Sequence, residues 1–222
     1  MVMKAVRALV PHSAKRVIKG AIYANHNQRL LTAARAQGAL KLHLACGPKI
    51  LPGWLNIDIA PYPGAMTMRM PGGLDVFLDR SAQYAYCSHM LHYLDYPGEA
   101  SAFVAQVYRI LKPGGVLRIV VPSIETIIRA YVANDGAFFK EQEKHHWDWA
   151  TTKLEHLICA MRADYADGSV KYGYDLETMT KLLRNVGFSR VIPSSFNKSE
   201  FEQLRIDYRG NSSLALIVDA VK

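Results

Sequence analysis

The sequence predicts a doubly wound α/β fold. Apolar runs typical of buried strands alternate along the chain with segments of helical periodicity, and glycine, proline and capping residues separate them. The 222 residues, 50% hydrophobic and 21% charged, are enough to bury one core, and this composition excludes disordered and collagen-like chains. The longest apolar runs are far shorter than the roughly 20 residues that cross a bilayer, so no membrane span is expected.

Residues 1–38 are predicted to form a basic amphipathic helical arm. Ser13 is a candidate N-cap, and a break is expected near Asn25–Asn27. Residues 1–57 contain nine Lys or Arg and no acid, whereas the rest of the chain has 18 bases and 19 acids, so the whole net charge of +8 lies at the front. The apolar side chains at helical spacing are Val17, Ile18, Ala21, Ile22, Leu30, Leu31 and Ala34.

The remaining residues, 39–222, are predicted to form one domain. Asp95 and Pro97 are predicted to start a helix that the Lys112–Gly115 turn stops. Ser123 is expected to cap the next helix. Asp175 is expected to cap a third helix, which ends where Gly187 adopts a left-handed conformation. Residues 134–173 are predicted to form an irregular helical insert that covers the acceptor site. Strands are predicted at residues 40–45, 54–59, 65–68, 84–87, 116–121, 190–194 and 213–220.

Gly47 and Asp58 have the spacing of a nucleoside-binding site. Gly47 follows the first strand, where a backbone turn approaches a ligand closely, and Asp58 ends the second strand, where a carboxylate can accept hydrogen bonds from ribose hydroxyls. The pattern G-x-G-x-x-G is absent, which argues against NAD and FAD. The gap between the two strands is too short for an ordinary crossover helix.

Longer motifs resemble the class I S-adenosylmethionine-dependent methyltransferases, in the branch with the pattern "LNLGCG…PGWxNxD". The matching segments are Leu42–Pro48, Leu51–Asp58, Ser88–Leu94 (against "SHxLEHL"), Tyr108–Ile119 (against "RxLKPGGxLRI"), Tyr174–Asp175 and Val186–Phe188. The resemblance implies a Rossmann-like sheet of seven strands, mostly parallel with an antiparallel last strand. It also implies S-adenosylmethionine as the cofactor, and a short first crossover is typical of this branch.

Site residues carried over by position surround the cofactor. Ala45, Cys46 and Gly47 would face its methionine part, Asp58 its ribose, and Cys87, Ser88 and His89 the region of the sulfonium. Four departures bear on catalysis. Ala45 stands where the family frequently has glycine, and Ser123 stands where it has an acid. Arg69-Met70 occupies the position of the acid that usually holds the adenine, for which Asp79 is a doubtful substitute. His92-Tyr93 replaces the Glu-His pair of the motif after the fourth strand.

His89 and His92 are the candidate catalytic bases, because both follow the fourth strand and histidine titrates near neutral pH. For His92, a packing role is equally consistent with the sequence. The cluster His145-His146-Trp147-Asp148-Trp149 lacks metal-ligand spacing and is read as an amphipathic segment, so no metal is predicted.

The leading hypothesis is methyl transfer to a small-molecule or glycan acceptor, with O-methylation favoured. A catalytically silent scaffold and a nucleic-acid methyltransferase are the alternatives. The near-neutral charge of residues 58–222 argues against a nucleic-acid partner.

The arm, residues 1–38, is interpreted as a lid over the cofactor cleft or as a peripheral contact with an anionic membrane, with the lid favoured. The oligomeric state is left open. Three cysteines without a motif and an N-terminus unlike an export signal predict a cytoplasmic protein.

Overall fold

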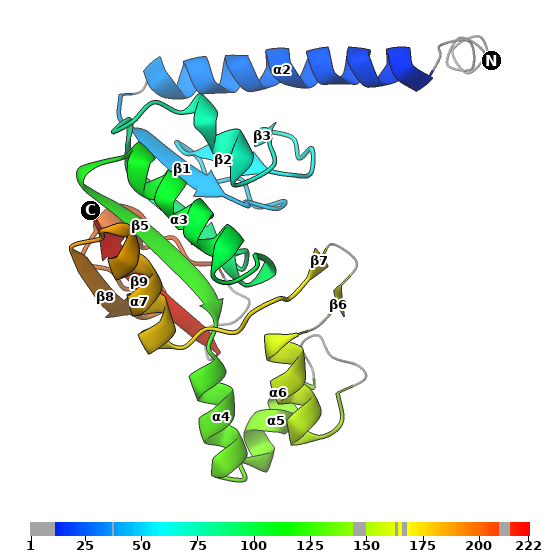
Figure 1. Ribbon diagram of the computed structural model, residues 1–222, viewed down its shortest axis with the longest axis vertical. Coiled ribbons are helices and arrows are strands. Elements are labelled where there is room, and N and C mark those ends of the chain that lie inside the picture. Colours follow the sequence, from blue (N-terminus) through cyan, green and yellow to red (C-terminus); the bar gives the residue numbers. More distant parts are fainter. Residues whose placement is uncertain (1–11, 37, 144–149, 163, 166–167, 209–213) are drawn as a thin grey trace.

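A computed structural model describes residues 12–36, 38–143, 150–162, 164–165, 168–208 and 214–222. Figure 1 shows a central sheet with the long helix α2 at one edge and a group of three short helices, α4 to α6, beyond the end of β5. The His145–Trp149 cluster lies outside the described residues. Among the described helices, none is both long and apolar enough to cross a membrane.

The sheet confirms the predicted fold class. Seven strands lie in the order β3-β2-β1-β4-β5-β9-β8, and β9 runs in the direction opposite to the other six. Strand order reverses between β1 and β4, which is where ligands bind in open α/β sheets. The strands are β1 (Leu40–Leu44), β2 (Leu55–Asp58), β3 (Ala65–Thr67), β4 (Ala82–Ser88), β5 (Leu111–Pro122), β8 (Arg190–Ser194) and β9 (Ala215–Val221).

One face of the sheet is covered by two amphipathic helices, α3 (Gly98–Ile110) and α7 (Leu176–Val186), which contact each other. Asp175 caps α7 by accepting from the Thr178 N–H, and Gly187 ends it at φ +117°, both as predicted. Helix α3 begins after Pro97 and stops at Ile110. The main core lies between these helices and β1, β4 and β5.

The opposite face is covered by irregular chain in the described structure. Residues 195–208, between β8 and β9, fold back over it together with the β1–β2 loop. Phe196, Ile206 and Tyr208 pack there against Tyr86 of β4 and Val120 of β5. A 3-10 turn, Glu202–Leu204, lies beside β4. This segment, which the sequence analysis left unassigned, forms one wall of the pocket described below.

Two local expectations were wrong. Helix α2 (His12–Ala36) is continuous, without a break near residues 25–27. The Lys112–Gly115 segment stops α3 as expected but belongs to β5 rather than to a free turn. There the Gly114 N–H donates to the Lys222 carbonyl, and the Lys222 N–H donates to the Gly115 carbonyl, both at 3.0 Å.

The described side chains of α2, residues 24–36, dock it on the β3 edge of the sheet. Asn27 imitates a neighbouring strand: its Nδ2 donates to the Thr67 carbonyl at 2.8 Å, and the Thr67 N–H donates to its Oδ1 at 2.9 Å. Leu31 is buried in the main core. These contacts close an edge that would otherwise expose unpaired backbone groups.

The insert contains α5 (Gly136–Gln142), α6 (Lys153–Met161) and a two-stranded hairpin, β6 (Asp164–Tyr165) and β7 (Gly168–Ser169). Helices α5 and α6 pack with α4 (Ile124–Val132) in a small separate core, and Ser123 caps α4 as predicted. The chain then returns along η2 (Leu91–Tyr93), where the Lys171 N–H donates to the His92 carbonyl at 2.8 Å.

Candidate active site

The turn after β1 has an unusual backbone. Ala45 has φ +55° and Gly47 φ +53°, both in the left-handed region. Such a conformation is uncommon for alanine and is found at functional sites more often than elsewhere. A Cβ added to Gly47 would meet no atom within 4 Å, so this side of the turn faces open space. Burial and the nearby Asp58 carboxylate raise the pKa of the Cys46 thiol to about 11, so Cys46 is a neutral lining group rather than a nucleophile.

Asp58 holds this turn from behind. Its Oδ2 accepts from the Gly47 N–H and its Oδ1 from the Ala60 N–H, each at 2.8 Å. A carboxylate has about four acceptor positions, so both oxygens can accept one more hydrogen bond. Asp58 therefore connects the ends of β1 and β2 and can still bind ribose hydroxyls.

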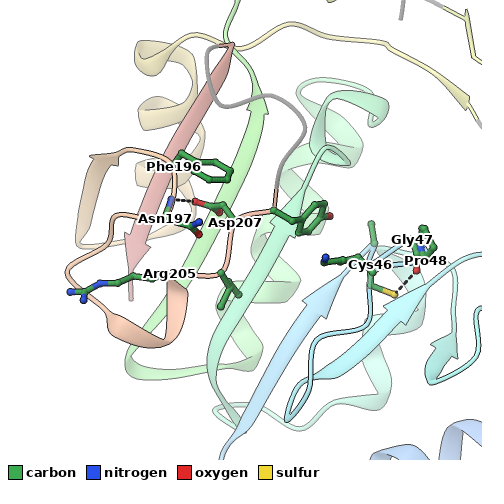
Figure 2. A pocket seen from close by; sticks show the side chains of 11 residues that line it. Cys46, Gly47, Pro48, Phe196, Asn197, Arg205 and Asp207 are labelled. Atoms are coloured by element: carbon green, nitrogen blue, oxygen red, sulfur yellow. Dashed lines mark hydrogen bonds between the residues drawn. The ribbon is translucent and has the colours of Figure 1, made fainter. Parts of the chain in front are cut away.

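A pocket of about 960 Å³ opens beside the turn. Figure 2 shows Cys46, Gly47 and Pro48 on one side of it and Phe196, Asn197 and Asp207 on the other. The second wall comes from the segment between β8 and β9, and the sequence analysis missed it. The lining residues are Ala45, Cys46, Gly47, Pro48, Lys49, Phe196, Asn197, Arg205, Ile206, Asp207 and Tyr208.

Arg118 anchors the second wall from inside the sheet. Its fully buried guanidinium donates Nε to Asp207 Oδ1 at 3.0 Å and Nη2 to Oδ2 at 2.6 Å. Nη1 donates to Oδ1 of Asp219 at 2.7 Å, and Asp219 is the residue of β9 that pairs with Arg118 of β5. The Ser195 carbonyl accepts from Nη2 at 3.0 Å. The sequence contains one sign of this arrangement, which is Arg118 itself: a charged residue inside an apolar strand requires a buried partner of opposite charge.

The end of β4 carries Cys87, Ser88 and His89. Burial raises the pKa of Cys87 to about 12, and its side chain lies within the sheet core. Ser88 Oγ and His89 Nδ1 are 2.9 Å apart. His89 has φ +55°, and its N–H donates to the Val120 carbonyl at 2.8 Å, so β5 holds it in this conformation.

His92 lies in a different environment from His89. It is 4% exposed, and burial, with a smaller contribution from the charge of His89, lowers its pKa to about 3. A histidine with such a pKa is neutral at physiological pH and a weak base. The structure therefore favours the packing role for His92.

The structure brings only part of the predicted set together. Ala45, Cys46 and Gly47 line the pocket and Asp58 supports them, whereas Cys87, Ser88, His89 and His92 are not among its lining residues. Asp79 forms an ion pair with Arg109 at 2.5 Å, so it is committed elsewhere than at an adenine site. Within the described parts of the chain, no cluster of three or more metal-ligating side chains occurs.

Residues 67–119 match the family described as "Methyltransferase domain". Together with the strand order and its single antiparallel strand, this partial match supports the predicted fold, that of the class I S-adenosylmethionine-dependent methyltransferases. S-adenosylmethionine is the cofactor of this class, and the open turn, the Asp58 carboxylate and the pocket volume fit such a group.

Solved structures with a similar fold include three methyltransferases, each 14% identical to this chain. A SAM-dependent methyltransferase from Archaeoglobus fulgidus has a TM-score of 0.49, covering 90% of this chain and 94% of its own. The 1,6-didemethyltoxoflavin N1-methyltransferase of Burkholderia thailandensis scores 0.47, with 100% and 87% covered. A SAM-dependent methyltransferase from Thermotoga maritima scores 0.47, with 93% and 97% covered. No curated protein matches the chain.

Proposed function

We propose that this protein transfers a methyl group from S-adenosylmethionine to a hydroxyl of a small-molecule or glycan acceptor. The observation that carries the proposal is the pairing of a left-handed turn at the end of β1 with a left-handed His89 at the end of β4. Both lie at the carboxyl ends of neighbouring central strands, at the point where strand order reverses. Strained residues at two adjacent strand ends are typical of a built ligand site.

Ala45, Cys46, Gly47 and Asp58 are the residues that hold the cofactor in this proposal. The bound cofactor supplies an electrophilic methyl group on a positively charged sulfur. Positioning the acceptor is then the main task, and an acceptor hydroxyl also has to lose a proton. His89 is the base, because it lies at the end of β4 and hydrogen-bonds Ser88 through Nδ1, whereas His92 is buried and weakly basic.

Calorimetric titration with S-adenosylhomocysteine tests the cofactor half of the proposal. Native protein should bind, and Asp58→Ala should weaken binding about 10- to 100-fold, the effect of lost hydrogen bonds to a charged group. Asp79→Ala is the matched control and should bind as the native protein does, because Asp79 pairs with Arg109. No binding at millimolar ligand by the native protein would refute the assignment.

Incubation with radiolabelled S-adenosylmethionine and a panel of sugars, phenols and lipid-linked glycans tests the transfer half. Alkali-stable labelling of a hydroxyl compound, lost in His89→Gln, is the expected result. Cofactor binding without any labelled product would instead favour a catalytically silent scaffold.

We further propose that the basic residues of the arm contact an anionic surface. In the described structure, α2 contacts β2 and β3, and none of its residues lines the pocket, which weighs against the lid. Residues 1–23 contain five Lys or Arg and no acid, and each base near an anionic membrane contributes about 1 kcal/mol.

Two truncations separate the roles of the arm. Removal of residues 1–23 should abolish sedimentation with phosphatidylserine vesicles while the melting temperature stays near that of the native protein. Removal of residues 1–38 should also lower the melting temperature, because Asn27 and Leu31 are lost from the sheet edge. A loss of S-adenosylhomocysteine affinity in the shorter truncation would support the lid instead.

A further inference from the structure

We propose that the second wall of the pocket binds a sugar ring, so that the hydroxyl to be methylated belongs to a sugar rather than to a simple phenol. Phe196, Asn197 and Asp207 carry the proposal, and Figure 2 shows all three on this wall. The inference deepens the proposed function and rests on it only for the identity of the reaction. The three residues bind and position the acceptor and take no part in the transfer itself.

Asp207 is a buried carboxylate held in one orientation. Its side chain is 3% exposed, and Arg118 donates Nε to Oδ1 at 3.0 Å and Nη2 to Oδ2 at 2.6 Å. The Asn197 N–H donates to Oδ2 at 2.9 Å. A carboxylate has about four acceptor positions, so Oδ1 can accept one more hydrogen bond. Because Asp207 lines the pocket and its geometry is fixed in advance, a ligand hydroxyl is a suitable donor for that position.

The remaining acceptor position of Asp207 favours a ligand with more than one hydroxyl. A ligand that covers a carboxylate removes water from it, and this costs free energy unless the ligand donates a hydrogen bond in return. A simple phenol has one hydroxyl, which is the group to be methylated, so its apolar ring would leave Asp207 without that hydrogen bond. A sugar has a neighbouring hydroxyl that can donate to Asp207 while another accepts the methyl group.

Phe196 and Asn197 give the second wall two further properties that suit a sugar. Phe196 is half-buried, since it packs against Tyr86 and Val120 and also lines the pocket. An aromatic ring can pack on the C–H groups at the face of a sugar ring. Asn197 lines the pocket as well, and its side-chain amide offers a donor and an acceptor to hydroxyl groups. An apolar surface bordered by polar groups matches a ring with apolar faces and hydroxyls at its edge.

The charges around the pocket suit a hydroxyl acceptor better than an amine. Lys49 lies over the Tyr208 ring, with Nζ 5.5 Å from the ring centroid, and Arg205 donates Nε to the Ser199 carbonyl at 3.0 Å. Asp207 is the only acid among the described residues that line the pocket, and a buried guanidinium already engages it. A positively charged amine would therefore meet two cations and one acid that is already paired.

Saturation-transfer NMR on the protein loaded with S-adenosylhomocysteine tests the sugar site without requiring methyl transfer. The probes are the methyl glycosides of common hexoses, with phenol and 4-methylphenol for comparison, and at least one glycoside should bind more tightly than either phenol. Asp207→Asn should weaken glycoside binding about 10-fold or more, the effect of a lost hydrogen bond to a charged group. Asp219→Asn is the matched control, because Arg118 also holds Asp219 but Asp219 does not line the pocket. Its glycoside binding should equal that of the native protein.

Asn197→Gly is a second variant, chosen because it leaves the fold intact. Asn197 is exposed and has φ +53°, a conformation that glycine adopts without strain. The variant keeps the backbone N–H that donates to Asp207 and removes only the amide, so glycoside binding should fall about 2- to 10-fold. It decides the question if Asp207→Asn does not fold.

Four results would overturn the inference. Two concern the native protein: tighter binding of a phenol than of every glycoside, or no detectable glycoside binding. The third is an equal loss of glycoside binding in Asp207→Asn and Asp219→Asn. The fourth is weaker binding of S-adenosylhomocysteine in Asp207→Asn alone, which would assign Asp207 to the ammonium group of the cofactor.

The same experiment separates the sugar site from the proposed function. A glycoside that binds through Asp207 but is not methylated by radiolabelled S-adenosylmethionine leaves the sugar site standing and refutes the transfer. Transfer to a phenol and to no glycoside has the opposite meaning.

Discussion

An Arg118→Met variant is expected to lose about 3 to 5 kcal/mol of unfolding free energy, the usual cost of breaking a buried ion pair from one side. Arg118 is fully buried, and its removal leaves the carboxylates of Asp207 and Asp219 without a cation in the core. Residues 195–207 lose their anchor at the same time. Urea unfolding followed by circular dichroism measures the loss.

Two further variants make this result specific. Arg190→Met removes a cation from an exposed pair with Glu200, each side chain 56% exposed, and should cost no more than about 1 kcal/mol. The triple variant Arg118→Met/Asp207→Asn/Asp219→Asn should recover most of the loss, because no unpaired buried charge is left. An Arg118→Met protein as stable as Arg190→Met would contradict the assigned role.

Acidification from about pH 7.5 to about pH 5 is expected to remove about 4 kcal/mol of stability through two buried histidines. Burial lowers the pKa of His43 to about 4 and that of His92 to about 3 from 6.5. Stability is therefore complete above pH 6.5 and declines as pH falls towards these values, because only the unfolded chain takes up the protons. Each histidine contributes about 2 kcal/mol at about pH 5.

The test compares unfolding free energies at the two pH values in native protein and His92→Leu. The other titrating groups are common to both proteins, so the difference isolates His92. The variant should lose about 2 kcal/mol less than the native protein over this interval, whatever its stability at neutral pH. Parallel pH profiles would show that His92 is accessible to protons in the folded state.

The local features of the fold could be read from sequence because adjacent residues cause them. Asp175 and Ser123 satisfy the free N–H groups of the helix that each precedes, and Gly187 adopts the left-handed conformation that ends α7. The turn after β1 and the acid after β2 were found in the same way, since both follow a strand end directly. Asp58 indeed accepts from the Gly47 N–H, 11 residues away.

The second wall of the pocket could not be predicted in this way. Arg118 meets Asp207 and Asp219 across 89 and 101 residues of chain, and the pairing of β5 with β9 decides which residues become neighbours. Residues 195–208 cover the face of the sheet opposite to α3 and α7, where a helix would be usual. This segment could not be predicted either, because irregular chain has no hydrophobic periodicity to detect.

The sequence by itself therefore determined the fold class, the start of α4, both ends of α7 and the turn after β1, because these depend on hydrophobic periodicity and on contacts within about a dozen residues. Only the tertiary structure decided that His92 is buried and weakly basic, and that Asp207 and Tyr208 line the pocket. Burial and hydrogen bonding at these positions arise from strand register and from the path of a long loop, which short-range sequence patterns do not encode.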